Sequence, residues 1–412
     1  MRHPHQHPVA ALTILTGLNF FNYVDRSVLF AVQPLVQQEF HRTDAEFGLL
    51  TSAFFFCYMF TAPFIGALAD RRPRRGIMIA GAVIWSAATL LTAFTYDFRT
   101  LLIRHTIVGI GEATFATIAP SFLADLFPEA KRGRVLGVFY LCIGLGTAVG
   151  YIVGGSVGHL HGWRAPFYVA AAPGFLLAAL LSFIPEPRRG MQDTLPETRE
   201  RGTVRGLIRN GAFWTATLGM AMWTFGVGAL QVWMPTFLSR MRHEPLEKAN
   251  LIFGGMTAFN AVFATLLGGW IGDRLLRKNR GAYYLVSSTT MLIAMPAMIV
   301  AITSRGPLMY PSMFLTEFLL FLNMAPLNAA IVNSVGAHIR ATAIAVNLFT
   351  IHLLGDAFSP TLVGYISDRS SLQTGFLAAV AAVGIASAIL YYGKRFAPPI
   401  KIDEPQPAGA AR

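Results

Sequence analysis

The sequence predicts an all-α membrane protein whose twelve spanning helices form two similar six-helix bundles. Of its 412 residues, 54% are hydrophobic and 13% are charged, whereas a soluble protein carries roughly 25% charged residues. Long apolar runs alternate with short charged loops along the whole chain. A Gly-x-x-x-Asp-Arg segment that ends one such run at Asp70 recurs at Asp273. Two membrane halves that carry the same charged loop at the same point are typical of a transporter.

The twelve helices follow from the lengths of the apolar runs. A helix needs about 20 mainly apolar residues to cross a bilayer. We expect spans near residues 10–37, 46–69, 76–96, 99–125, 133–158, 164–184, 212–239, 247–272, 282–303, 308–333, 339–366 and 372–395. The first six form a bundle over residues 10–184, and the last six form a bundle over residues 212–395.

The remaining segments are polar. Residues 185–211 hold three prolines and many charges, which predicts a cytoplasmic linker between the bundles. Residues 1–9 and 396–412 are expected to be a disordered N-terminal tail and a C-terminal tail. The first apolar run is long enough to span a membrane rather than serve as a cleaved signal. Both cysteines lie inside apolar runs, so we expect no disulfide.

The distribution of cations predicts the orientation. With both termini on one side, 23 of the 33 Lys and Arg residues fall in segments on that side and eight fall on the other. Cytoplasmic loops carry the excess of Lys and Arg. We therefore expect a multi-pass plasma (inner) membrane protein with both termini in the cytoplasm. Since the cations are spread over short loops, the net charge of +12 does not indicate a nucleic-acid partner.

The two charged loops are predicted to act as a gate on the cytoplasmic side. An anionic side chain is favourable at a helix N-terminus, and a charge cluster that breaks when the halves rock would be bistable. The alternative is that these loops hold only the cations expected on the cytoplasmic side. The gating candidates are Asp70, Arg71 and Arg74 in the first half and Asp273, Arg274 and Arg277 in the second.

The first apolar run contains charges that are costly inside a membrane. Asn19, Asn22 and Arg26 share one stripe of a helix, and Asp25 lies at its edge. A polar stripe on a spanning helix must face protein or water, and ionisable residues at this depth are functional candidates by default. The alternative is a structural ion pair that holds this helix to a neighbour.

The fourth run carries Glu112 at a depth level with Asp25, and Arg104 lies two turns nearer the outside. Burial favours the protonated form of a carboxyl group and a nearby Arg favours the ionised form. A shift in this balance between two conformations would load and release a proton. The hypothesis is that Asp25 and Glu112 titrate, and that Arg26 is the counter-charge for which the substrate competes.

The second half contributes further candidates. Glu317 lies 205 residues after Glu112, close to the repeat offset of 203, but no basic residue is near it in sequence. His352 and Asp356 are spaced as i and i+4, and a mid-helix His can donate to an anion or titrate. Arg26 and His352 could converge on a central cavity and bind a phosphate or carboxylate. The alternative for His352 is an ordinary core residue.

Four glycines at strict four-residue spacing predict one close helix contact. Such spacing lets two spanning helices approach each other closely. The glycines are Gly146, Gly150, Gly154 and Gly158.

These features indicate a transporter that needs no cofactor and no metal. Its expected partners are the lipid bilayer, protons and a small anionic or amphiphilic substrate. The alternative function is a proton-linked symporter for organic anions such as sugar acids or aromatic acids. A receptor or structural protein would need neither inward-facing charges nor a repeated gate. No nucleophile elbow, phosphate loop or metal-ligand spacing indicates an enzyme.

Five stretches are similar to the Spinster family of the major facilitator superfamily. They are Asn22–Arg26, Arg104–Pro120, Gly162–Phe167, His352–Asp356 and Gly364–Asp368. The resemblance implies the major facilitator fold and proton-coupled movement of lysophospholipids or sphingosine 1-phosphate. It also implies that Asp25, Arg26, Glu112 and His352 serve protonation and head-group contact. We add Tyr23, which lies in the first stretch, to the substrate contacts, and we expect a monomer.

Overall fold

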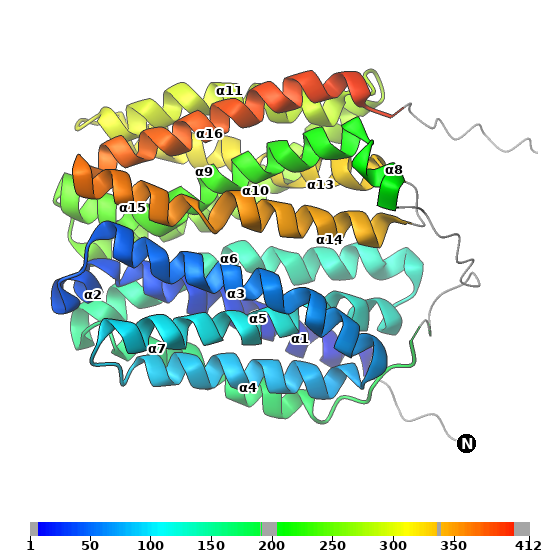
Figure 1. The fold of residues 1–412 in the computed structure, drawn as a ribbon, viewed down its shortest axis with the longest axis horizontal. Coiled ribbons are helices and arrows are strands. Elements are labelled where there is room, and N and C mark those ends of the chain that lie inside the picture. Colours follow the sequence, from blue (N-terminus) through cyan, green and yellow to red (C-terminus); the bar gives the residue numbers. More distant parts are fainter. Residues whose placement is uncertain (1–6, 190, 192–203, 336–338, 399–412) are drawn as a thin grey trace, which may run out of the picture.

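The computed structural model describes residues 7–189, 191, 204–335 and 339–398, and their regular elements are all helices. Figure 1 shows an elongated bundle in which the chain before residue 190 and the chain after 203 lie in separate halves. We call the end that carries the start of the first helix and the end of the last one the terminal end. The opposite end is the distal end.

The predicted fold class is confirmed, and the helices follow the predicted runs closely. The first half contains α1 (Pro8–Ala31), α2 (Gln33–Phe40), α3 (Asp44–Arg71), α4 (Arg74–Thr92), α5 (Phe98–Leu126), α6 (Glu129–His161) and α7 (Ala165–Leu181). The second half contains α8 (Val204–Ile208), α9 (Gly211–Arg242), α10 (Leu246–Leu276), α11 (Ala282–Thr303), α12 (Met309–Phe321), α13 (Met324–Asn333), α14 (Arg340–Ile351), α15 (Ser359–Arg369) and α16 (Leu372–Gly393).

Within the described ranges, nine helical segments are long and apolar enough to cross a membrane. The other three predicted spans are α1, α7 and α9, which have 24, 17 and 32 residues. The polar stripe on α1 lowers its hydropathy without changing its length. The predicted tails lie mostly outside the described residues, as do residues 190 and 192–203 of the predicted linker. The described part of the linker contains α8, an additional short helix.

Three predicted helices are each divided in two. Pro34, Pro326 and Pro360 stand within the first three residues of α2, α13 and α15, and proline cannot donate the backbone hydrogen bond of a continuing helix. A π-helical turn, His352–Asp356, also separates α14 from α15. In this turn Ala357 donates its backbone N–H to the carbonyl of His352 at 3.1 Å. The turn sets the direction of two predicted site residues.

The predicted glycine contact is present between α6 and α1. A Cβ atom added at Gly146 would lie 2.4 Å from the carbonyl oxygen of Phe20, and one at Gly150 would lie 2.6 Å from that of Val24. No real Cβ atom tolerates such distances. These glycines therefore bring α6 against α1, the helix that carries Asp25 and Arg26.

The two halves are in backbone contact near the distal end. A Cβ atom added at Gly48 of α3 would lie 2.5 Å from the carbonyl oxygen of Pro360, and one at Gly364 of α15 would lie 2.3 Å from that of Asp44. Farther toward the terminal end, α3 and α14 meet through the rings of Phe60 and Phe349, whose centroids are 6.4 Å apart. The helix α3 therefore approaches the second half most closely at the distal end, where it meets α15, and less closely where it meets α14.

Replacing Gly48 by alanine is expected to destabilise this closure. The new methyl group would meet backbone atoms, so α15 must shift, which costs roughly 1–3 kcal/mol. Gly137 of α6 is the matched control because an added Cβ there meets no atom within 4 Å. Thermal melts of the purified protein should show a lower midpoint for Gly48→Ala and no loss for Gly137→Ala. Equal midpoints would contradict the close contact.

Candidate functional site

The centre of the candidate site is an ion pair between α1 and α5. Arg26 donates from Nη2 to Glu112 Oε2 at 2.5 Å. The side chain of Glu112 is fully buried and that of Arg26 is 12% exposed. The structure thus brings together two predicted site residues from separate helices and leaves access to the pair through the arginine.

Aromatic rings surround the guanidinium of Arg26. Its Cζ atom lies 4.8 Å from the ring centroids of both Tyr23 and Phe54, and 5.3 Å and 5.8 Å from those of Phe55 and Tyr58. Aromatic faces attract cations, and more strongly where water is excluded. Tyr23 was predicted at the site, whereas Phe55 and Tyr58 of α3 were not. Two rings spaced i and i+3 are too common in membrane helices to single them out.

His352 reaches the same rings from the second half. Its ring stacks on Phe55 at a centroid distance of 5.4 Å and meets the edge of Tyr58 at 5.3 Å. Its Nδ1 atom lies 3.0 Å and 3.2 Å from the two carboxylate oxygens of Asp356. Phe55 and Tyr58 therefore contact both Arg26 and His352, as the predicted convergence on a central site requires.

Asp25 faces a different neighbour. It is 4% exposed and accepts a hydrogen bond from the hydroxyl of Thr89 in α4. It makes no described hydrogen bond or ion pair with Arg26 or Glu112. Its contacts in this conformation are those of a link between α1 and α4, and its protonation role stays a prediction. Thr89 was not predicted, because a lone threonine in an apolar run gives no signal.

Several buried polar atoms of the central site have no hydrogen-bond partner among the described residues. They are Arg26 Nε, Glu112 Oε1, Asn22 Nδ2 and His105 Nε2. Buried polar groups in folded proteins are nearly always paired. The site therefore offers both donors and an acceptor to a ligand that enters it.

Arg104 lies outside the central site. It donates to the carbonyl of Leu91 and to the hydroxyl of Thr95 at 3.0 Å, and so ties α5 to the end of α4. The next residue, His105, stacks on Phe54 at a centroid distance of 5.3 Å. Arg104 and His105 are adjacent in α5. The side chain of Arg104 nevertheless contacts the end of α4, whereas that of His105 lies against one of the rings around Arg26.

The first predicted gate is held within its own half. Arg74 Nη1 lies 2.6 Å from Asp125 Oδ2. The carboxylate of Glu186 accepts the backbone N–H groups of Arg74 and Arg75 at 3.0 Å and 2.8 Å. Asp70 and Arg71 are exposed. Glu186, at the start of the predicted linker, therefore caps α4.

The side chains of the second predicted gate are exposed, and their described contacts lie within the second half. Asp273 accepts a hydrogen bond from the hydroxyl of Tyr283 at 2.7 Å. The guanidinium of Arg274 lies 5.4 Å from the ring of Trp270, and Arg277 is exposed. No described ion pair joins either loop to the opposite half in this conformation. The gating role of both loops stays a prediction.

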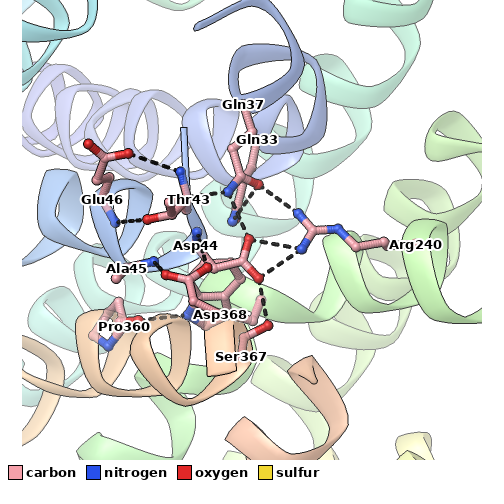
Figure 2. A network of polar contacts seen from close by, with 11 residues as sticks. Gln33, Gln37, Thr43, Asp44, Ala45, Glu46, Arg240, Pro360, Ser367 and Asp368 are labelled. Atoms are coloured by element: carbon pink, nitrogen blue, oxygen red, sulfur yellow. Dashed lines mark hydrogen bonds and ion pairs between the residues drawn. The ribbon is translucent and has the colours of Figure 1, made fainter. Parts of the chain in front are cut away.

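The halves are instead joined by a polar network at the distal end, which Figure 2 shows. We call Gln37, Asp44, Arg240, Ser367 and Asp368 the distal latch. Arg240 of α9 donates to both carboxylate oxygens of Asp44 at 2.8 Å, and also to Gln37 Oε1 at 2.9 Å. Ser367 donates to Asp44 Oδ2 at 2.6 Å.

Asp368 completes the distal latch by capping a helix of the other half. Its carboxylate accepts the backbone N–H groups of Asp44 and Ala45 at 2.8 Å and 2.9 Å. These groups begin α3, where a negative charge is favoured by the helix dipole. Thr43 and Glu46 cap the same turn locally. The gate predicted at the terminal end would combine a carboxylate at a helix N-terminus with cations. In this conformation such a combination, Asp368 on α3 and Arg240 on Asp44, lies at the distal end.

Comparison with known proteins defines the class. Residues 15–360 match the family model of the Major Facilitator Superfamily, so the chain is a multi-pass membrane transporter of that superfamily and not an enzyme. It is 36% identical over 383 residues to Protein spinster homolog 3 of Danio rerio, covering 88% of this chain and 77% of the relative. It belongs to the spinster family.

Two further matches agree. The chain is 36% identical over 384 residues to the Sphingosine-1-phosphate transporter SPNS2 of Xenopus tropicalis, covering 89% of this chain and 75% of that protein. A solved bacterial homolog of the human lysosomal transporter Spinster, in an inward-facing and unoccupied conformation, superposes with a TM-score of 0.86 at 23% identity. That match covers 95% of this chain and 97% of the solved chain.

Proposed function

We propose that this protein is a proton-coupled secondary transporter that moves an anionic amphiphile, such as a lysophospholipid or a sphingosine 1-phosphate-like lipid. The observation that carries the proposal is the position of Arg26, which pairs with Glu112 and shares its ring contacts with His352. The relative named as a sphingosine-1-phosphate transporter supports the lipid class.

The coupling follows from competition for one guanidinium. While Glu112 is ionised, it holds Arg26 Nη2. A proton on Glu112 removes that attraction and frees Arg26 for an anionic head group, which binds a guanidinium strongly through paired hydrogen bonds. Departure of the head group lets Arg26 return, which expels the proton. Charge on the site then changes little in either step, and His352 adds a second donor.

An apolar pocket of about 20 Å³ lies in the second half. Its lining residues are Val227, Leu230, Gln231, Met234, Phe253, Met298, Ala301, Ile302, Met313, Thr316, Glu317, Leu320 and Phe321. A cavity that holds benzene measures about 150 Å³, so this pocket has no room for an alkyl chain in this conformation. The proposed lipid class is supported by the named relative.

The excess of cations at the terminal end supports a cytoplasmic position for both termini in the plasma (inner) membrane. In that orientation, the halves are held together on the outer side of the membrane in this conformation. The distal latch is then the outer gate, and the loops at Asp70 and Asp273 would form the inner gate in the other conformation. We further infer that the transporting unit is a monomer, since the central site is formed by one chain.

Ligand-dependent thermal stability tests the substrate class. A lysophospholipid or sphingosine 1-phosphate should raise the melting midpoint of the purified protein, and small aromatic or sugar acids should not. Arg26→Gln should lose this shift, while Arg104→Gln, which removes a cation outside the site, should keep it. Stabilisation by the small acids alone would favour the organic-anion symporter instead.

A further inference from the structure

The second half contains a buried carboxyl group that the proposed coupling does not use. Glu317 lies in α12 and is 7% exposed. It accepts hydrogen bonds from Thr257 Oγ1 at 2.5 Å and from Asn260 Nδ2 at 3.1 Å. Both partners belong to α10 and are neutral. Glu317 also stands in the wall of the apolar pocket.

The surroundings of Glu317 supply no positive charge. Among the described residues no ion pair includes it, whereas Glu112 is paired with Arg26. The helices around it contribute apolar side chains and Gln231, and the titratable neighbour is Tyr151 of α6. The hydroxyl of Tyr151 donates to the carbonyl of Gln231 at 2.7 Å. An ionised Glu317 would thus be a buried charge without a counter-charge, which proteins avoid.

The polar partners of Glu317 suit a neutral acid. Asn260 is fully buried, and its Oδ1 atom has no hydrogen-bond partner in the described chain. A side-chain amide offers a donor and an acceptor, so a half-turn of the amide would let Oδ1 accept the O–H of a protonated Glu317. The Thr257 hydroxyl can donate to the remaining carboxyl oxygen. Among the described residues, no group of three or more His, Cys, Asp or Glu side chains is placed to hold a metal ion.

We propose that Glu317, Asn260 and Thr257 form a proton-binding site of the second half, occupied by a proton in this conformation. The two halves then neutralise equivalent buried carboxyl groups in different ways, the first with Arg26 and the second with a proton. The neutral acid also keeps the pocket wall uncharged. This proposal does not depend on the identity of the cargo. The proton-binding site can therefore be disproved while the proposed transport function holds, and the transport function can be disproved while the proton-binding site holds.

Infrared difference spectroscopy of the purified protein at neutral pH tests the site. Subtracting the spectrum of Glu317→Gln from that of the wild type should leave a positive carbonyl band of a protonated carboxyl group. The matched difference for Glu112→Gln should lack that band, because Glu112 is ionised beside Arg26. Absence of the acid band in the Glu317→Gln difference, with a carboxylate band in its place, would overturn the proposal.

A second variant addresses the hydrogen bonds even if Glu317→Gln does not fold. Asn260→Leu should retain the acid band and move it toward the frequency of a less hydrogen-bonded acid. Sodium chloride should not change the band relative to choline chloride. A band that disappears when sodium is added would assign the site to a metal cation and contradict the proposal, as would an acid band that Asn260→Leu leaves unmoved.

Discussion

Replacing Arg26 by alanine is expected to abolish proton-driven transport and to destabilise the protein by roughly 3–5 kcal/mol, since it leaves one buried charge without its partner. The charge left behind is Glu112, whose side chain is fully buried. The four rings around the guanidinium also lose their cation. Uptake into proteoliposomes should fall at least about tenfold, and the melting midpoint should fall with it.

A double variant separates the two effects. Arg26→Met combined with Glu112→Leu removes both charges and retains apolar volume, a change that is often neutral or stabilising for a buried pair. The melting midpoint should therefore recover while transport stays absent. Recovery of transport in this double variant would show that the pair is only structural. Retained transport in Arg26→Ala would contradict the proposed competition for the guanidinium.

Locking the distal end should stop transport completely and reversibly. Ser52 Oγ of α3 and Thr361 Oγ1 of α15 are 2.6 Å apart, close enough for two cysteines at these positions to form a disulfide. The background should carry Cys57→Ser and Cys142→Ser, because both native cysteines are free. Oxidation of the Ser52→Cys, Thr361→Cys variant should reduce uptake to that of empty liposomes, and a thiol reductant should restore it.

A disulfide inside one half serves as the matched control. The hydroxyl oxygens of Ser288 in α11 and Ser387 in α16 are 3.4 Å apart and both helices belong to the second half. Oxidised Ser288→Cys, Ser387→Cys protein should transport normally, because the halves can still separate. Undiminished transport through the oxidised Ser52–Thr361 variant would contradict a distal end that must open.

The features that could be predicted from the sequence are those that depend on residue type and on spacing within one segment. Charged residues are so costly inside a membrane that Arg26, Glu112 and His352 could be singled out without knowing what they touch. The division into two halves followed from the repeated loop at Asp70 and Asp273. The close contact of α6 with α1 followed from glycine spacing alone.

The distal latch depends on tertiary contacts and could not be predicted. Asp44 and Asp368 are 324 residues apart in sequence, yet the side chain of one accepts the backbone N–H of the other. In the sequence, Asp44 has the pattern of an ordinary loop charge, and Asp368 stands out only as the last residue of a family-like stretch to which no role was assigned. The ring contacts of Tyr58 likewise depend on how α3 packs against the π-helical turn. That turn was not predicted from the sequence.

The most direct test of the central claim measures cargo accumulation in proteoliposomes with an imposed pH gradient. The cargo is the lysolipid or sphingosine phosphate that stabilises the purified protein. The wild type should accumulate it only when the gradient is present, and Glu112→Gln should exchange it without responding to the gradient. Gradient-driven accumulation by Glu112→Gln equal to that of the wild type would contradict proton coupling through Glu112 and Arg26.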